Sequence, residues 1–266
     1  MQITTTLSLP VPSFRLLSFV AFAVLLCCSP AIAQKAKPDS LMTIPMISGN
    51  VGLFKPGADM GNRFGNVLEV GGSFTIKTKS NWMFGLDAHY LYSERVKEDV
   101  LAGLRTNQGG IFGGDGLYAD VRTTMRGFKL PVVKAGRLFS MPFGRAGVNS
   151  GLFVMAGVGL MQHKIHFEDV TRNAPMVAEP YSKGYDRLTN GLIITEQIGY
   201  LYLDKNRRIN FFVSMEFTQG FTESRRSYDF VTRTTDTKKR LDLLNGVKVG
   251  WIFPIYKKLP SNYYYQ

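Results

Sequence analysis

The chain has 266 residues, a formal net charge of +12, 45% hydrophobic residues and only two cysteines. This length allows one large domain or two small ones. So basic a composition predicts an anionic partner, either nucleic acid or an anionic membrane surface. The N-terminal residues described below predict an exported chain, so nucleic acid is not expected as a partner. Lipopolysaccharide phosphates are then the expected anionic neighbours. Charges that only solvate loops explain the excess equally well.

Residues 1–33 have the features of a secretory signal peptide. Arg15 precedes an apolar run from Leu16 to Leu26, and Ala31-Ile32-Ala33 supplies the small residues that signal peptidase recognises. The run is too short to span a bilayer comfortably, which disfavours an anchoring helix. A lipoprotein signal at Cys27 is disfavoured because a large residue, leucine, precedes it. Cleavage after Ala33 removes both cysteines, so we expect neither disulfides nor thiolate metal sites in the mature chain.

Alternation of apolar and polar residues at a period of two dominates the rest of the chain. In Asn81–Val96, Trp82 and Tyr90 lie on the face opposite Asp87 and His89. The preceding run alternates as well, and Thr78-Lys79-Ser80 joins the two into a predicted hairpin. Several segments of this kind exceed the usual length of globular strands. The predicted strands are Ile44–Lys55, Asn66–Lys77, Asn81–Val96, Tyr118–Phe139, Gly151–Glu168, Leu188–Asp204, Arg208–Glu223 and Leu241–Tyr256.

The connections between these segments alternate between short and long. Lys79-Ser80 and Lys205-Asn206-Arg207 are tight, whereas Lys97–Leu117, Asp169–Arg187 and Ser224–Arg240 are long. Outer-membrane barrels have this asymmetry, with turns facing the periplasm and loops facing outside. No apolar stretch long enough for a membrane helix follows the signal.

We therefore predict an all-β fold, a closed antiparallel transmembrane β-barrel of about eight strands with short periplasmic turns and long outer loops. The barrel is expected to span residues 44–256. Residues 34–43 are predicted to form a periplasmic N-terminal segment, and residues 257–266 a periplasmic C-terminal tail.

Two short motifs resemble the small outer-membrane barrels of Bacteroidota. Phe128-Lys129-Leu130-Pro131-Val132-Val133-Lys134 resembles a strand of these proteins, and Gly250-Trp251-Ile252-Phe253-Pro254-Ile255-Tyr256-Lys257 resembles their last strand. The family includes the PorT and PorG proteins of the type IX secretion and gliding machinery. The resemblance implies an outer-membrane location and an accessory role in an envelope complex. The chain departs from many outer-membrane proteins by ending Tyr263-Tyr264-Tyr265-Gln266 instead of on a terminal aromatic residue.

A set of polar residues is predicted to face the barrel lumen. Glu196 is ambiguous because Ile194 shares its face, and we place it inside. Glu216 and Lys248 lie on predicted neighbouring strands, so we expect an ion pair between them. A polar channel or proton path is one interpretation, but a plug of ion pairs is favoured because side chains fill a barrel of this size. The predicted lumen network is Glu69, Asp87, His89, Lys129, Glu196, Glu216 and Lys248.

A catalytic site is not expected. Barrel enzymes that modify lipids use a histidine with serine and a carboxylate, and the candidates here are His163 and His166, with Glu168 and Asp169 close by. The two histidines differ in parity and point to opposite faces of a strand, and no serine nearby stands out as a nucleophile. Three histidines without mature cysteines give no recognised metal-ligand spacing, so neither a metal nor a cofactor is predicted.

Basic residues in the last long connection are candidate contacts for lipopolysaccharide phosphates or for a partner protein. They could equally be solvated charge. These residues are Arg225, Arg226, Lys238, Lys239 and Arg240.

The sequence thus favours a non-enzymatic outer-membrane barrel, a scaffold or accessory component of an envelope or secretion complex that binds partners through its loops. The expected partners are outer-membrane lipid, lipopolysaccharide and other envelope proteins. A lipid A-modifying barrel enzyme and a soluble periplasmic lipocalin-like binder remain as alternatives. The sequence does not indicate the specific partner or the oligomeric state.

Overall fold

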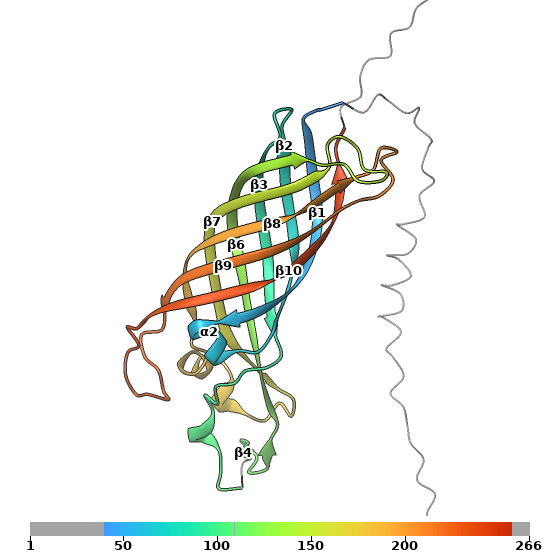
Figure 1. Ribbon diagram of the computed structural model, residues 1–266. Coiled ribbons are helices and arrows are strands. Elements are labelled where there is room, and N and C mark those ends of the chain that lie inside the picture. The colour runs from blue at the N-terminus through green and yellow to red at the C-terminus, as the bar shows by residue number, and fades with distance from the viewer. Residues whose placement is uncertain (1–39, 109, 257–266) are drawn as a thin grey trace, which may run out of the picture. The chain divides into compact units, whose positions relative to one another are not determined.

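The computed structural model describes residues 40–108 and 110–256. Within them, eight antiparallel strands close into a barrel in the order β1-β10-β9-β8-β7-β6-β3-β2 (Figure 1). Each of the segments predicted from the sequence corresponds to one barrel strand, so the predicted fold class is confirmed. The strands are β1 (Ile44–Gly57), β2 (Val67–Lys77), β3 (Trp82–Ser93), β6 (Val121–Ser140), β7 (Gly151–Asp169), β8 (Thr189–Leu203), β9 (Asn210–Ser224) and β10 (Lys239–Pro254).

The first and last strands close the sheet. Val51 of β1 is opposite Val70 of β2 on one side and opposite Val249 of β10 on the other. Closure satisfies the backbone groups that an open edge strand would leave unpaired. None of the helices in the described residues is long and apolar enough to cross a membrane.

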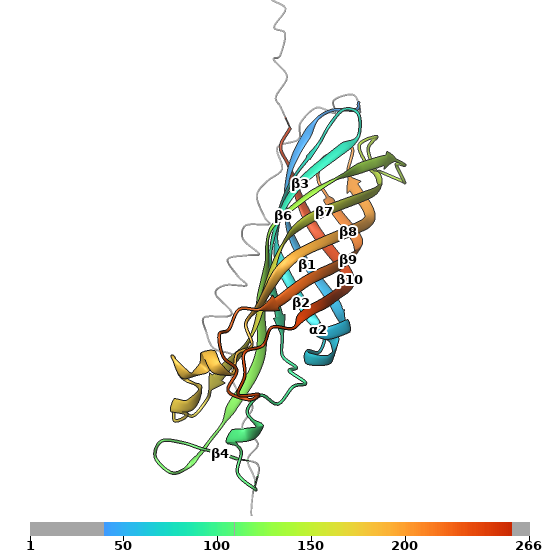
Figure 2. The ribbon, with the colours of Figure 1, turned by 90° about the vertical axis from the view of Figure 1, so that its left-hand side faces the viewer.

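The two ends of the barrel differ in their connections. At one end, called here the turn end, lie the start of β1, the end of β10 and the connections 78–81, 141–150 and 204–209. At the other, the loop end, lie the connections 58–66, 94–120, 170–188 and 225–238. The three connections predicted to be long lie at the loop end and are longer than any at the turn end, which confirms the predicted asymmetry, whereas the first loop-end connection, 58–66, is shorter than 141–150. The second and third of the loop-end connections extend well beyond the strands (Figure 2).

The loop-end connections contain short elements that the sequence analysis did not predict. A short helix, α2 (Ala58–Arg63), lies in the first of them. The second contains a small hairpin of β4 (Ile111–Phe112) and β5 (Tyr118–Ala119). The strand predicted to begin at Tyr118 is accordingly broken before Val121, where β6 begins.

The barrel presents apolar side chains outward along every strand. Leu53, Leu192 and Val158 are 68%, 65% and 60% exposed. Successive residues of a strand point to opposite faces, so the same alternation sends polar side chains into the lumen. The face that a soluble protein would bury is here on the outside.

A β-bulge in β6 changes which residues face inward. The register of β6 against β7 shifts between Lys129 and Val132. Lys129 and Lys134 are both buried, although five residues apart, while Leu130 is 53% exposed. A regular strand would place residues of such spacing on opposite faces.

Two apolar layers fill the lumen near its ends. Along the inward face of β10, Ile252 belongs to the layer at the turn end and Leu244 to the layer at the loop end, with Lys248 between them. The turn-end layer is Ile44, Met46, Met83, Leu138, Phe153, Met155, Leu201, Leu203, Phe212 and Ile252. The loop-end layer includes Phe54, Met60, Phe64, Val67, Leu91, Met125, Met161, Ile165, Ile193 and Leu244.

The predicted signal peptide (1–33), residues 34–39 of the predicted N-terminal segment and the predicted tail (257–266) lie outside the described residues. Of the N-terminal segment, residues 40–43 are described. The Asn149 side chain donates to the Ser40 carbonyl at 2.9 Å and accepts from the Met42 N–H at 3.3 Å.

Candidate functional site

Buried charges occupy the lumen between the two apolar layers. This set, called here the lumen cluster, has three lysines and three carboxylates, so its charges balance when all are ionised. The side chains of Glu69, Lys129, Glu216 and Lys248 are each 1% exposed. The cluster is Glu69, Asp87, Lys129, Lys134, Glu216 and Lys248.

Two glutamates bind the lysines from strands of the barrel wall that are not neighbours. Glu216 of β9 accepts from Lys129 at 2.6 Å, from Lys134 at 2.9 Å and from Lys248 at 2.6 Å. Glu69 of β2 lies 2.5 Å from the Nζ of Lys129 and 2.7 Å from the Nζ of Lys248. The predicted pairing of Glu216 with Lys248 is present, and it is one contact of a larger network.

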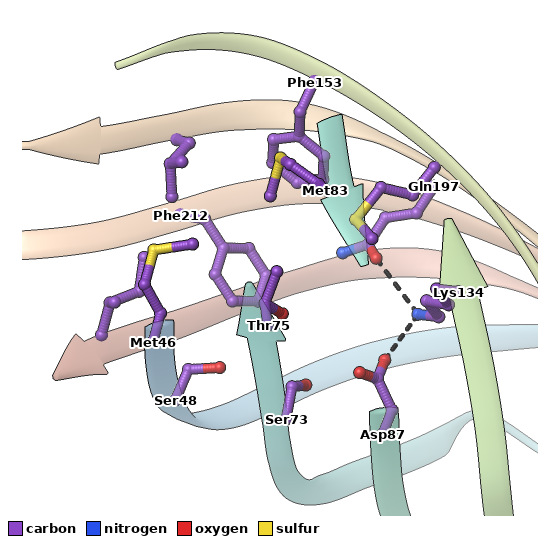
Figure 3. A pocket seen from close by; sticks show the side chains of 13 residues that line it. Met46, Ser48, Ser73, Thr75, Met83, Asp87, Lys134, Phe153, Gln197 and Phe212 are labelled. Carbon is purple, nitrogen blue, oxygen red and sulfur yellow. Dashed lines mark hydrogen bonds and ion pairs between the residues drawn. The ribbon is translucent and has the colours of Figure 1, made fainter. Parts of the chain in front are cut away.

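Lys134 extends the network toward the turn end. Its Nζ lies 2.7 Å from Asp87 Oδ2 and donates to Gln197 Oε1 at 3.1 Å (Figure 3). These three side chains line one side of a cavity of about 40 Å³, and Met46 and Phe153 of the turn-end layer line another. A cavity of that volume has room for only a few water molecules.

His89 joins the cluster through Glu69 and an amide. Its Nδ1 lies 3.5 Å from Glu69 Oε1, and its Nε2 lies 3.2 Å from Asn50 Nδ2. Asn50 in turn donates to Ser73 Oγ at 2.5 Å. Both imidazole nitrogens of His89 therefore have a polar neighbour, Glu69 on one side and Asn50 on the other.

The loop-end layer covers the cluster with an aromatic ring. Lys129 Nζ lies 5.1 Å and Lys248 Nζ 5.9 Å from the centre of the Phe54 ring, which is itself buried. Burying a charge costs several kcal/mol unless partners satisfy it, and each lysine here has at least two oxygen partners. The arrangement is a neutral plug that holds distant strands together.

One predicted lumen residue is placed wrongly and another was missed. Glu196 is exposed on the outer face of β8, and the next residue, Gln197, points inward and contacts Lys134. The predicted network omits Lys134; counting by two from Lys129 gives it the outer face, because such counting ignores the bulge. Pro131, which cannot donate to a ladder, is the signal that marked the irregularity. Glu69, Asp87, His89, Lys129, Glu216 and Lys248 face the lumen as predicted.

His163 belongs to a separate buried group near the loop end. Its Nε2 lies 3.0 Å from Asp242 Oδ2, and Thr222 Oγ1 donates to the same oxygen at 2.6 Å. The Phe64 ring packs edge-on against the imidazole at 5.5 Å. Because the Thr222 hydroxyl donates to the carboxylate and not to the histidine, the trio lacks a nucleophile–base contact. His166 is half-buried on the opposite face of β7.

Ion pairs link the four connections of the loop end. Arg63, Glu98, Arg187 and Asp229 each come from a different connection, and they form a chain in that order. The Arg63–Glu98 and Arg187–Asp229 distances are 3.5 and 3.3 Å. This chain of ion pairs is called here the loop clasp. Arg63 also donates to the Arg187 carbonyl at 3.3 Å, so side-chain contacts link all four connections of the loop end.

Most of the predicted basic contacts at this end are already paired within the chain. Arg226 Nε donates to Asp186 Oδ1 at 2.8 Å, and these hydrogen bonds raise the pKa of the Arg226 guanidinium. Arg225 Nη1 lies 2.8 Å from Glu223 and Lys238 Nζ 3.7 Å from Asp59, while Arg240 contacts Asp236. Lys239 is exposed.

Comparisons with known proteins give distant likenesses only. No family model matches the chain, and no curated protein does. Ail, the attachment invasion locus protein of Yersinia pestis, in complex with the heparin analogue sucrose octasulfate, is 8% identical with a TM-score of 0.38, over 79% of this chain and 98% of that one. Neisserial surface protein A is 8% identical (TM-score 0.37; 77% and 96% covered). The N-terminal β-barrel domain of Pseudomonas aeruginosa OprF is 12% identical (TM-score 0.31; 77% and 97% covered). Likenesses at this level assign neither a family nor a function.

The charged side chains of the lumen cluster and of the loop clasp are thus paired within the chain. Among them, no group of three or more histidine, cysteine, aspartate or glutamate side chains is arranged to hold a metal ion. The carboxylates of the lumen cluster are paired with lysines, and Glu98, Asp186 and Asp229 at the loop end are paired with arginines. The surfaces left for recognition are the outer face and the loop end.

Proposed function

We propose that the chain is a non-enzymatic outer-membrane β-barrel with a closed lumen, which acts as a scaffold or accessory component of an envelope complex. The observation that carries the proposal is the inversion of the barrel. Its apolar side chains face outward and its charges are paired inside. A soluble lipocalin-like binder would bury its apolar face, so this alternative does not fit.

Aromatic residues border the apolar belt at the turn end. Trp251 and Phe211 are opposite each other, as are Phe211 and Tyr202, whose rings stack at 5.0 Å. Trp82 and Phe253 add two more exposed rings near the same end. Aromatic girdles of this kind mark the interface between lipid and water in transmembrane barrels. Strands of 11 to 20 residues are long enough to cross the bilayer when tilted.

The closed lumen favours a scaffold over a pore. The neutral ion-pair plug between two apolar layers supports a lumen without an aqueous route, and the loop clasp adds paired charges at one end. Recognition in barrels of this architecture falls to the loops. The resemblance of two strand motifs to PorT- and PorG-like barrels supports an accessory role in the type IX secretion machinery, with lipopolysaccharide and other envelope proteins as partners.

The membrane location is tested by fractionation of cells that express the full chain. We expect the protein in the outer-membrane fraction, with an unboiled sample that migrates differently from a boiled one. Planar bilayers with the purified protein should show no steady conductance. Recovery from the soluble periplasm would overturn the barrel proposal, and stable open channels would overturn the closed lumen.

The scaffold role is tested by site-specific photo-cross-linking in the same cells. A cross-linker at exposed Tyr118, in the second long connection, is compared with one at exposed Lys79, in a tight turn. We expect discrete envelope-protein adducts from the loop position. Lipid A mass spectra from cells with and without the gene should be identical, and a changed acyl or phosphate pattern would favour the lipid-modifying enzyme instead.

A further inference from the structure

A pocket of about 380 Å³ lies on the outside of the barrel at the loop end. It is bordered by the end of β1, by Phe64 and Gly65 after α2, and by the residues that follow β3. It is called here the rim pocket. It is separate from the lumen cluster and from the loop clasp.

The charges of the rim pocket are mostly positive and exposed. Lys55, Arg95 and Lys97 line it together with one carboxylate, Glu94, and all four side chains are exposed. Lys97 Nζ donates to the Gly61 carbonyl at 2.5 Å, which fixes it beside the pocket and leaves two of its protons available. Within the part of the chain that the structure describes, no carboxylate lies within ion-pair distance of Lys55 or Arg95. Lys55 and Arg95 differ in this respect from Arg225 and Arg226, which are paired with carboxylates.

The rim pocket lies next to the edge of the apolar belt that is nearer the loop end. Leu53, Leu68 and Tyr92 are opposite one another on three adjacent strands and face outward. Two positions further toward the loop end along the same three chain segments, the outward-facing residues are charged or polar. They are Lys55, Asn66 and Glu94, and all three line the pocket. The change from apolar to charged side chains therefore occurs at this line.

We propose that the rim pocket binds the phosphorylated sugar headgroup of an outer-leaflet lipid through its phosphate monoester. This inference rests on the proposed outer-membrane location, in which the loop end faces outside and the edge of the belt lies at the level of the headgroups. The Arg95 guanidinium can bind a phosphate with two parallel hydrogen bonds. Lys55 and Lys97 add charge, and the aliphatic stem of Lys55 lies along the belt edge.

Glu94 gives the pocket its preference for a phosphorylated sugar over a bare phosphate. A carboxylate beside three cations repels a small dianion, but it accepts hydrogen bonds from hydroxyl or amide groups of a sugar. The acyl chains of the same lipid would then continue down the belt past Leu53 and Tyr92. Inorganic phosphate has neither the hydroxyl pattern nor the chains, so it should bind much more weakly.

Native mass spectrometry of the detergent-purified barrel tests the proposal, with hexa-acyl lipid A carrying two phosphates as the probe. We expect one tightly held lipid A, and about tenfold or more weaker binding in the K55Q/R95Q variant, because charge-assisted hydrogen bonds are lost. The control is K205Q/R208Q, which removes two exposed cations at the turn end and should leave binding unchanged. Glu94→Gln should retain lipid A and bind inorganic phosphate better than the wild type.

The outcomes separate the site from the membrane location. Equal binding by the wild type and K55Q/R95Q would overturn the rim pocket as the site. Displacement of lipid A by millimolar inorganic phosphate would show a general phosphate site and overturn the lipid assignment. Heat-modifiable migration of the same samples reports the fold. If K55Q/R95Q does not fold, the single variants Lys55→Gln and Arg95→Gln are compared, each expected to weaken binding. A wild type absent from the outer membrane would refute the proposed function itself.

Discussion

Lys134 of β6 and Glu216 of β9 are joined across the barrel lumen by a hydrogen bond of 2.9 Å, although neither strand neighbours the other. The bulge between Lys129 and Val132 makes the contact possible, because it turns Lys134 inward. Two lysines of one strand thereby reach the same carboxylate, and Glu216 becomes the residue on which three buried cations depend.

Removal of this carboxylate should be strongly destabilising. In Glu216→Gln, three buried lysines lose a charged partner, and breaking a buried ion pair from one side typically costs about 3–5 kcal/mol. Urea unfolding of the refolded barrel, followed by tryptophan fluorescence, measures the loss. The control is Glu223→Gln on the same strand, whose side chain is 45% exposed and pairs with Arg225. It should cost less than about 1 kcal/mol, and equal losses in the two variants would contradict the plug.

The strands and their order along the chain are predictable from the sequence, because alternation over long segments identifies both faces at once. The predicted inward position of Glu196 is wrong, because it rests on the charge of this one residue and not on the hydrophobicity of the other residues on the same face. Counting the whole face of β8 gives Leu192, Ile194, Ile198, Tyr200 and Tyr202 on the side of Glu196. That side is far more apolar than the side of Gln197, and it faces outward.

The cross-lumen contacts are not predictable from alternation. Which inward residue meets which depends on the stagger of all strands around the ring. A pattern of period two shows that Glu69 and Lys129 face inward, but not that they lie 2.5 Å apart. The loop clasp is equally hidden, because its residues lie on irregular connections whose paths the sequence does not define.

Opening the loop clasp should loosen the loops without affecting the barrel. Arg187 contacts both Glu98 and Asp229, so Arg187→Gln separates three connections at once. If the free energy of local loop opening falls by about 1.4 kcal/mol, the loops open about tenfold more often, and cleavage of the open form becomes about tenfold faster. Limited proteolysis by proteinase K measures this rate, and urea unfolding of the barrel should be unchanged. Arg233→Gln, an exposed arginine of the last connection, is the matched control. Equal protection in both variants would argue against the clasp.

Acid should release the last connection. Burial raises the pKa of Asp236, but the hydrogen bonds from Arg240 and from the Lys238 N–H outweigh it and hold the pKa below its ordinary value. The folded pKa is depressed, so the stabilising contribution of Asp236 is present above its unfolded pKa and is lost as pH falls through the folded value. Hydrogen exchange of residues 227–238, corrected for intrinsic rates, should accelerate below about pH 4. In Asp236→Asn, exchange should already be fast at neutral pH and should lose this acid dependence. An unchanged pH profile would refute the assignment.

Glu196 and Gln197 are adjacent, and their replacement by leucine should have opposite effects. Glu196 lies on the outer face between Ala156 of β7 and Phe217 of β9, in the middle of the apolar belt. A lipid-facing charge is unfavourable, less so for glutamate than for lysine or arginine, so Glu196→Leu should stabilise the barrel in a bilayer by about 1 kcal/mol. Gln197 accepts from Lys134 and donates to Ser214 at 2.8 Å. Gln197→Leu removes one hydrogen-bond partner from each of these buried groups and should cost about 1–3 kcal/mol. Unfolding midpoints in lipid vesicles measure both, and in detergent the gain from Glu196→Leu should shrink. If both variants were destabilised alike in vesicles, Glu196 would not face lipid.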